Sequence, residues 1–207
     1  MPKTQQQCEV IKEETKAKIL RGSMHYFARN GFAGTKMSDL ARGIGIGQGT
    51  IYLYFDSKED LFREIGVLVS NEREIKELAL LASVPMKAKS KIQRLTETIL
   101  RRLEEEEDFA ASIVLNTQLM LEQEPKDADA GGRYRTQATY QSDLYSYTSQ
   151  IIEQGQKEGS VVEGDSLKLA DYYWGVIYLY ALKKLFTSNF EMLSVDDIAR
   201  TILRQEP

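Results

Sequence analysis

The stretch TKMSDLARGIGIGQGTIYLYFDSK, residues 35–58, decides the fold expected for the N-terminal part of the chain. Thr35 is a favourable helix N-cap. The apolar residues after it recur at the three- and four-residue spacing of one buried helical face: Met37, Leu40, Ala41 and Ile44. Gly45 then provides a sharp turn, because glycine enters the left-handed backbone region without a steric penalty. The pattern therefore predicts a short helix that ends at a glycine turn.

A second short helix is expected over residues 48–54. Its pattern places Ile51 and Phe55 inward and leaves a polar set mostly outward: Gln48, Thr50, Tyr52 and Tyr54. Ser57 caps the next helix, whose first turn is acidic, as a helix N-terminus favours. Two helices joined by a glycine-containing turn have the geometry of a DNA-reading helix-turn-helix.

Residues 12–66 resemble the N-terminal domain of the tetracycline-repressor (TetR) family, with many fixed spacings in agreement. The resemblance is carried by Lys16-Ala17-Lys18-Ile19-Leu20, Phe27, Gly31-Phe32, Thr35, Asp39-Leu40-Ala41, Gly45-Ile46, Gly49-Thr50-Ile51-Tyr52, Tyr54-Phe55 and Ser57-Lys58-Glu59-Asp60-Leu61-Phe62. It implies an all-α protein with a three-helix helix-turn-helix head over residues 1–66. A C-terminal helical bundle, residues 67–207, would form the dimer and bind an effector.

The resemblance also implies which residues contact DNA. Tyr52 and Lys58 are expected to clamp phosphates, since a phenolic hydroxyl and an ammonium suit backbone oxygens. Gln48 and Thr50 are the expected base readers, because a glutamine can bond adenine in bidentate fashion. The remaining expected contacts are Lys16, Thr35, Lys36, Gly47, Gly49 and Tyr54. The family often has a serine and a basic residue at positions 47 and 48, so the base preference of this chain is left open.

The alternating glycines of residues 43–49 invite a second interpretation, a phosphate-cradling loop. Such a loop follows a strand and opens a helix, and here no strand precedes it. We interpret these glycines as the turn and as sites of close approach to DNA.

The charge of the chain is distributed unevenly. Residues 1–66 carry 10 Lys and Arg against 8 Asp and Glu, a net charge of +2, and the remainder carries 17 against 23, a net charge of −6. A mildly basic head on an acidic body is compatible with a DNA reader joined to another module.

Several functional classes are disfavoured by composition. The single cysteine, Cys8, and the single histidine, His25, rule out a zinc site built from clusters of those residues and leave no compelling catalytic triad. The sequence shows no signal-peptide core and no segment long enough to span a membrane. We expect a cytoplasmic protein without cofactor or metal.

Helical periodicity continues through the rest of the chain. Further helices are expected over residues 11–30, from 58 toward 82, around 92–103, and over 108–123, 134–158, 165–188 and 194–203, with a loop at 124–132. Residues 172–182 are apolar almost all round, which indicates a helix buried on more than one side. By resemblance, this helix and the last one join a four-helix dimer interface, with Tyr178, Leu182, Ile198 and Ile202 as the expected contacts.

Eight of the eleven tyrosines lie between Tyr134 and Tyr180, a distribution compatible with a pocket for an aromatic, hydrophobic or cationic molecule. The residues expected to line it are Phe109, Met120, Tyr140 and Trp174. The sequence thus predicts a homodimeric repressor that an effector releases from a palindromic DNA operator. A transcriptional activator, a ligand-independent regulator, a helical enzyme and a protein-binding adaptor remain alternatives.

Overall fold

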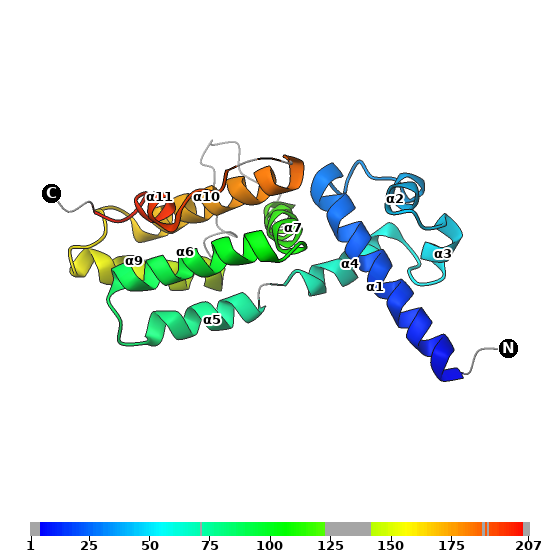
Figure 1. Ribbon diagram of the computed structural model, residues 1–207, viewed down its shortest axis with the longest axis horizontal. Coiled ribbons are helices and arrows are strands. Elements are labelled where there is room, and N and C mark those ends of the chain that lie inside the picture. Colours follow the sequence, from blue (N-terminus) through cyan, green and yellow to red (C-terminus); the bar gives the residue numbers. More distant parts are fainter. Residues whose placement is uncertain (1–4, 71, 123–141, 188, 190, 205–207) are drawn as a thin grey trace, which may run out of the picture. The chain divides into compact units, whose positions relative to one another are not determined.

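A computed structural model describes residues 5–70, 72–122, 142–187, 189 and 191–204 of the 207-residue chain. The chain divides into two compact units, Met1–Ser70 and Asn71–Pro207. The described residues form α-helices joined by turns, and an isolated antiparallel bridge pairs Val161 with Leu203 (Figure 1). The prediction of an all-α fold is confirmed. None of the helices in the described part of the chain combines the length and apolar character needed to cross a membrane.

The N-terminal unit is built around a small apolar core. Its helices are α1 (Gln5–Asn30), α2 (Met37–Ile44), α3 (Gln48–Tyr52) and α4 (Lys58–Leu68). Each helix contributes side chains with little or no exposed surface: Ile19 and Phe27 from α1, Leu40 from α2, Ile51 from α3, and Leu61 and Ile65 from α4. Full burial of such a side chain stabilises the fold by about 1.5–3 kcal/mol. This core fixes the orientation of the two short helices.

Glycine and serine set the helix ends in this unit, as predicted. Gly31 and Gly45 have φ angles of +74° and +66°, in the left-handed region that follows α1 and α2. Ser57 caps α4, since its side chain accepts a 3.0 Å hydrogen bond from the Asp60 backbone N–H. The predicted N-cap at Thr35 is wrong: Lys36 is the N-cap of α2, and the Thr35 hydroxyl instead donates to the Gly31 carbonyl at 2.6 Å.

The helix that begins at Lys58 is shorter than predicted. It ends at Leu68 rather than running toward residue 82, because Val69 leaves helical geometry with φ −89° and ψ 5°. The next helix, α5 (Glu72–Ser83), belongs to the second unit. No single helix therefore connects the two units.

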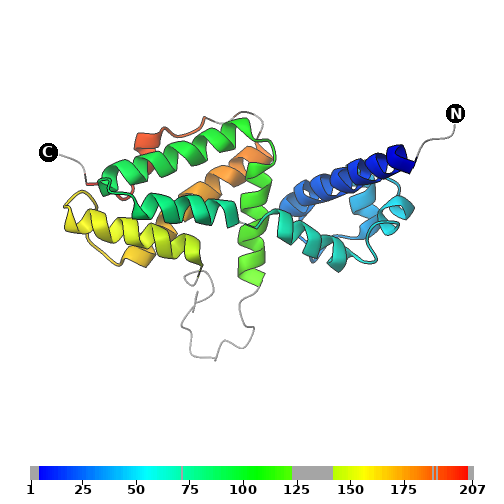
Figure 2. The ribbon, with the colours of Figure 1, turned by 90° about the horizontal axis from the view of Figure 1, so that it is seen from below.

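The C-terminal unit packs its helices around a second core. Besides α5, it contains α6 (Ala88–Glu105), α7 (Phe109–Glu122), α9 (Asp143–Lys157), α10 (Ser166–Phe186) and α11 (Val195–Ala199). Helix α9 contacts α5, α6 and α10, whereas α7 packs on α10 and α6 and runs crosswise to α5, α6 and α9 (Figure 2). The hydroxyl of the fully buried Tyr173 lies 3.0 Å from the Thr96 hydroxyl, and burial raises the pKa of Tyr173. The expected loop at 124–132 lies outside the described residues.

The last helix packs differently from the prediction. Ile198 and Ile202 are 0% and 1% exposed within the single chain, where α11 lies against α6. A side chain without accessible surface cannot contact a second subunit. The prediction that these two residues form a dimer interface is therefore wrong for this fold, because Ile198 of α11 and Ile202 of the turn that follows it complete the chain's own core.

Candidate functional site

Helix α3 presents the exposed face of the N-terminal unit that the sequence predicts to meet DNA. Gly47, Gln48 and Gly49 are exposed, and Thr50 is half-buried. Tyr52 is 46% exposed. An added Cβ would meet nothing within 4 Å at Gly49, so the surface beside Gln48 is open. Ile51 and Phe55 are buried and anchor this segment to the core of the N-terminal unit.

One exposed residue beside this face was missed by the sequence prediction. Leu53 directly follows α3 and is 80% exposed, although leucine is usually buried. The signal was present in the sequence, since a helical turn that buries Ile51 and Phe55 must direct residue 53 outward. Tyr54, predicted as a contact, is half-buried.

The remaining predicted DNA contacts occupy three different environments. Lys36 is exposed, as a phosphate contact requires. Lys16 is partly exposed and forms a 3.1 Å ion pair with Glu64 on α4. Thr35 is 6% exposed and its hydroxyl is used in the turn, so its side chain offers little surface to DNA.

Lys58 is held inside the N-terminal unit. Its ammonium donates 3.0 Å hydrogen bonds to the backbone carbonyls of Phe32 and Thr35 and lies 4.2 Å from the centroid of the Phe32 ring. The Phe32 ring stacks on Phe62 of α4 at 4.1 Å between centroids. Lys58 thus fastens the turn between α1 and α2 onto α4. This geometry favours a structural role over the predicted phosphate clamp.

The C-terminal unit contains a partly open cavity of about 550 Å³, within the range of small-molecule sites. Helices α5, α6, α7, α9 and α10 all contribute to its wall. Two predicted ligand residues, Phe109 and Trp174, line it. The side chain of Met120 and the whole of Tyr140 lie outside the described residues. Most of the wall is apolar, with Leu78, Leu81, Leu95, Ile99, Ile113 and Leu144 among its members.

One face of helix α10 lines the cavity, and another face of the same helix is exposed. Trp174 and Tyr178 line the cavity, and burial raises the pKa of the Tyr178 hydroxyl. Tyr178, predicted at the dimer interface, is therefore a wall residue here, and Leu182 is half-buried. The Trp174 indole N–H donates a 3.1 Å hydrogen bond to the Thr148 hydroxyl, which fixes the ring.

Three large apolar side chains of α10 form the exposed face: Tyr172, Leu179 and Phe186, which are 58%, 48% and 60% exposed. They recur every seven residues, so they lie along one side of the helix. We call this set the α10 stripe. Exposed apolar patches of this kind mark interaction sites on proteins.

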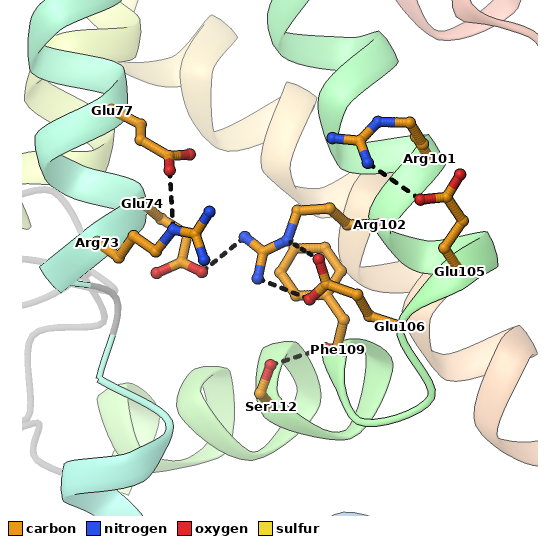
Figure 3. Close-up of polar contacts among 9 residues, drawn as sticks. All are labelled: Arg73, Glu74, Glu77, Arg101, Arg102, Glu105, Glu106, Phe109 and Ser112. Atoms are coloured by element: carbon orange, nitrogen blue, oxygen red, sulfur yellow. Dashed lines mark hydrogen bonds and ion pairs between the residues drawn. The ribbon is translucent and has the colours of Figure 1, made fainter.

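The polar part of the cavity wall is centred on Arg102, which sequence reasoning missed because no local motif marks it (Figure 3). Its guanidinium donates to both oxygens of Glu106, at 2.7 and 2.9 Å, and to Glu74 at 2.7 Å. It also lies 3.9 Å from the Phe109 ring centroid. Burial opposes the charge on Arg102, but the hydrogen bonds to Glu106 and Glu74 outweigh it and raise its pKa.

We also searched the described residues for a site that could bind a metal ion. Among the described residues, no group of three or more His, Cys, Asp or Glu side chains is arranged to hold a metal ion. Cys8 is an exposed free thiol.

Comparison with known proteins places the N-terminal unit in a family. Residues 19–65 match the family described as bacterial regulatory proteins, tetR family. The HTH-type transcriptional regulator YfiR of Bacillus subtilis (strain 168), itself uncharacterised, is 41% identical over 54 residues, 26% of either chain. The HTH-type transcriptional regulator AcrR of Shigella flexneri is 37% identical over 68 residues, 33% of this chain and 31% of its own. These curated relatives are thus matched over about a quarter to a third of their length.

The fold of the whole chain has counterparts among solved structures. A TetR-like transcriptional regulator from Rhodococcus sp. RHA1 superposes with a TM-score of 0.58 at 19% identity, covering 89% of this chain and 88% of the other. This likeness concerns the fold, and the family-specific residues lie in the N-terminal unit. The N-terminal unit of this chain therefore belongs to the tetR family of bacterial regulatory proteins.

Proposed function

We propose that this protein is a homodimeric transcriptional regulator, acting as a repressor, whose affinity for a DNA operator is lowered by a small-molecule effector. The observation that carries the proposal is the α2–turn–α3 unit, which matches a family of DNA-binding regulators and leaves Gln48 and Tyr52 exposed on a rigid core. In helix-turn-helix proteins the second helix of such a unit enters the major groove.

Within this proposal, the exposed residues divide into two groups. Gln48 and Thr50 read bases, and Leu53 is suited to apolar contact with a thymine methyl group. Tyr52 and Lys36 contact phosphates and position the unit without reading sequence. Lys58 acts indirectly, by holding the turn before α2.

The α10 stripe supports a dimer formed by two copies of this chain. Tyr172, Leu179 and Phe186 project from one side of a 21-residue helix. Two such helices packed against each other would remove these side chains from water, which is favourable by about 25 cal/mol for each Å² of apolar surface buried. A twofold dimer presents two DNA-reading units to an operator with two related half-sites.

The cavity supports an effector site. It is concave, mostly apolar and lined by a few polar groups, as small-molecule sites are. An effector that prefers the conformation with low DNA affinity shifts the protein toward it. A coupling free energy of about 1–3 kcal/mol lowers operator affinity on the order of 5–150-fold.

The proposal is tested by titrating the full chain into labelled random-sequence duplex DNA at a series of salt concentrations. We expect binding that weakens steadily with salt, because phosphate contacts release counterions. An adaptor that uses the N-terminal unit for protein contacts would show no binding to DNA even at low salt.

A further inference from the structure

The wall of the cavity contains an ion-pair cluster with unequal charges. Arg102 lies between Glu106, which accepts two of its hydrogen bonds, and Glu74, which accepts one. We call these three residues the Arg102 triad. The side chains of Arg102 and Glu74 are only 13% and 26% exposed, and both line the cavity (Figure 3).

The triad carries one positive and two negative charges, a net charge of −1. A monocation beside Glu74 brings that sum to zero. A monoanion at the same place brings it to −2 around a single guanidinium. Charges at this degree of burial interact more strongly than they do in water. The charge count therefore favours a cation.

Other charged side chains of the wall alter this balance little. Glu77 pairs at 2.9 Å with Arg73, whose side chain is 77% exposed, and such surface pairs contribute weakly. Arg94 is also exposed, so solvent and salt screen its charge. The half-buried Asp171 of α10 is a further carboxylate of the wall, and its negative charge favours a cation in the same way.

The aromatic residues of the cavity suit a cation as well. Tyr145, Trp174 and Tyr178 line it, besides Phe109, whose ring already contacts Arg102. The faces of such rings attract cations electrostatically, most strongly where water is excluded. The apolar remainder of the wall favours a hydrophobic body on the same molecule.

We propose that the cavity binds an organic monocation with an apolar body, and that Glu74 is the residue that pairs with its charge. This inference rests on the proposed effector function and specifies its ligand. When the ligand cation replaces Arg102 as the partner of Glu74, Arg102 loses one hydrogen bond. It keeps both bonds to Glu106 and its contact with Phe109. No charge is left without a counter-charge.

The position of Glu74 in the chain gives the exchange a regulatory consequence. Glu74 lies in the first turn of α5, the first helix after the boundary between the two units. Its bond to Arg102 ties that turn to α6. A cation that takes over Glu74 removes this tie, and so acts on the helix that follows directly from the DNA-binding unit.

The test uses three probes with the same apolar body: decyltrimethylammonium, decanol and decanoate, each below its micellar concentration. Trp174, the only tryptophan, lines the cavity and reports binding by fluorescence. We expect the cation to bind about tenfold or more tightly than decanol, and decanoate to bind most weakly. Glu74→Gln should abolish the preference for the cation, and Glu74→Asp should retain it.

Glu105→Gln is the matched control, because Glu105 pairs with Arg101 at 3.0 Å in a similar way but does not line the cavity. It should leave all three affinities unchanged. The inference is overturned if decanol or decanoate binds as tightly as the cation, if no probe binds, or if the control loses the preference too. Even if the Glu74→Gln variant unfolds, the relative affinities of the unmodified chain for the three probes test the inference. A chain that binds DNA but prefers decanoate refutes this inference alone.

Discussion

The Lys58 ammonium donates a 3.0 Å hydrogen bond to the backbone carbonyl of Thr35, 23 residues earlier in the chain. A second bond of equal length goes to Phe32, whose ring also lies beneath the ammonium. Lys58 begins α4 and Thr35 immediately precedes the N-cap of α2. The lysine thus sets the position from which the helix-turn-helix unit starts.

Replacing Lys58 by methionine should therefore lower stability more than it alters phosphate contacts. Loss of hydrogen bonds to a charged group costs about 1.5–3 kcal/mol. We expect the midpoint of thermal unfolding to fall, and the salt dependence of DNA binding by the folded protein to stay the same. If the variant melts at the same temperature as the original chain but its DNA binding depends less steeply on salt, Lys58 contacts a phosphate as first predicted.

Lys36→Ala provides the contrast, because Lys36 is exposed and its side chain makes no capping bond to α2. Its stability should match that of the unmodified chain. The slope of log affinity against log salt should fall by roughly one unit for each phosphate contact removed. An unchanged slope would exclude Lys36 from the interface.

Gln48→Ala should change which sequence is preferred. Gln48 is exposed at the start of α3, so its removal should leave the fold intact. A lost bidentate contact to a base costs about 1–3 kcal/mol of discrimination. Comparing affinities for operators that vary at each position should reveal one relaxed position in every half-site. An identical profile would mean that Gln48 is not a base reader.

Leu179→Glu should separate the dimer into monomers. Leu179 is 48% exposed in the middle of the α10 stripe, and a charge there would have to be buried between two copies. Sedimentation equilibrium at micromolar concentration should show monomers, with operator binding greatly weakened. Lys184→Glu, on an exposed position of α10 away from the stripe, should remain dimeric. A dimeric Leu179→Glu variant would place the interface elsewhere.

Ile198→Ala tests the corrected role of α11. Since Ile198 is fully buried within one chain, we expect a loss of about 2–5 kcal/mol in unfolding free energy, as for large-to-small core substitutions. Below its melting temperature the variant should keep the dimer. Dissociation without loss of stability would instead support a contact between subunits.

Local features explain why much of the N-terminal unit could be predicted. Gly31, Gly45 and Ser57 act on their immediate neighbours, so their residue types alone indicate where helices begin and end. The end of α4 had no such signal. No glycine or proline follows Val69 directly, and the nearest glycine, Gly66, lies inside α4, so the apolar pattern predicted one long helix.

Contacts between distant residues could not be predicted in the same way. The stripe of α11 shows that one side of the helix is apolar, but not whether Ile198 meets its own chain or a partner. Lys58 presented a similar ambiguity, because its acceptors lie 23 and 26 residues away. The cavity residues Glu74 and Arg102 come from different helices, and their pairing depends on the packing of α5 against α6.

Whether two copies of this chain read DNA through α3 can be measured by selecting bound sequences from a random pool of duplex DNA with the purified full chain. We expect an enriched inverted repeat whose half-site centres are about 34–36 Å apart, one turn of the double helix, or a multiple of that distance. A pool that shows no enriched sequence after repeated rounds, or only a single unpaired half-site, would contradict it.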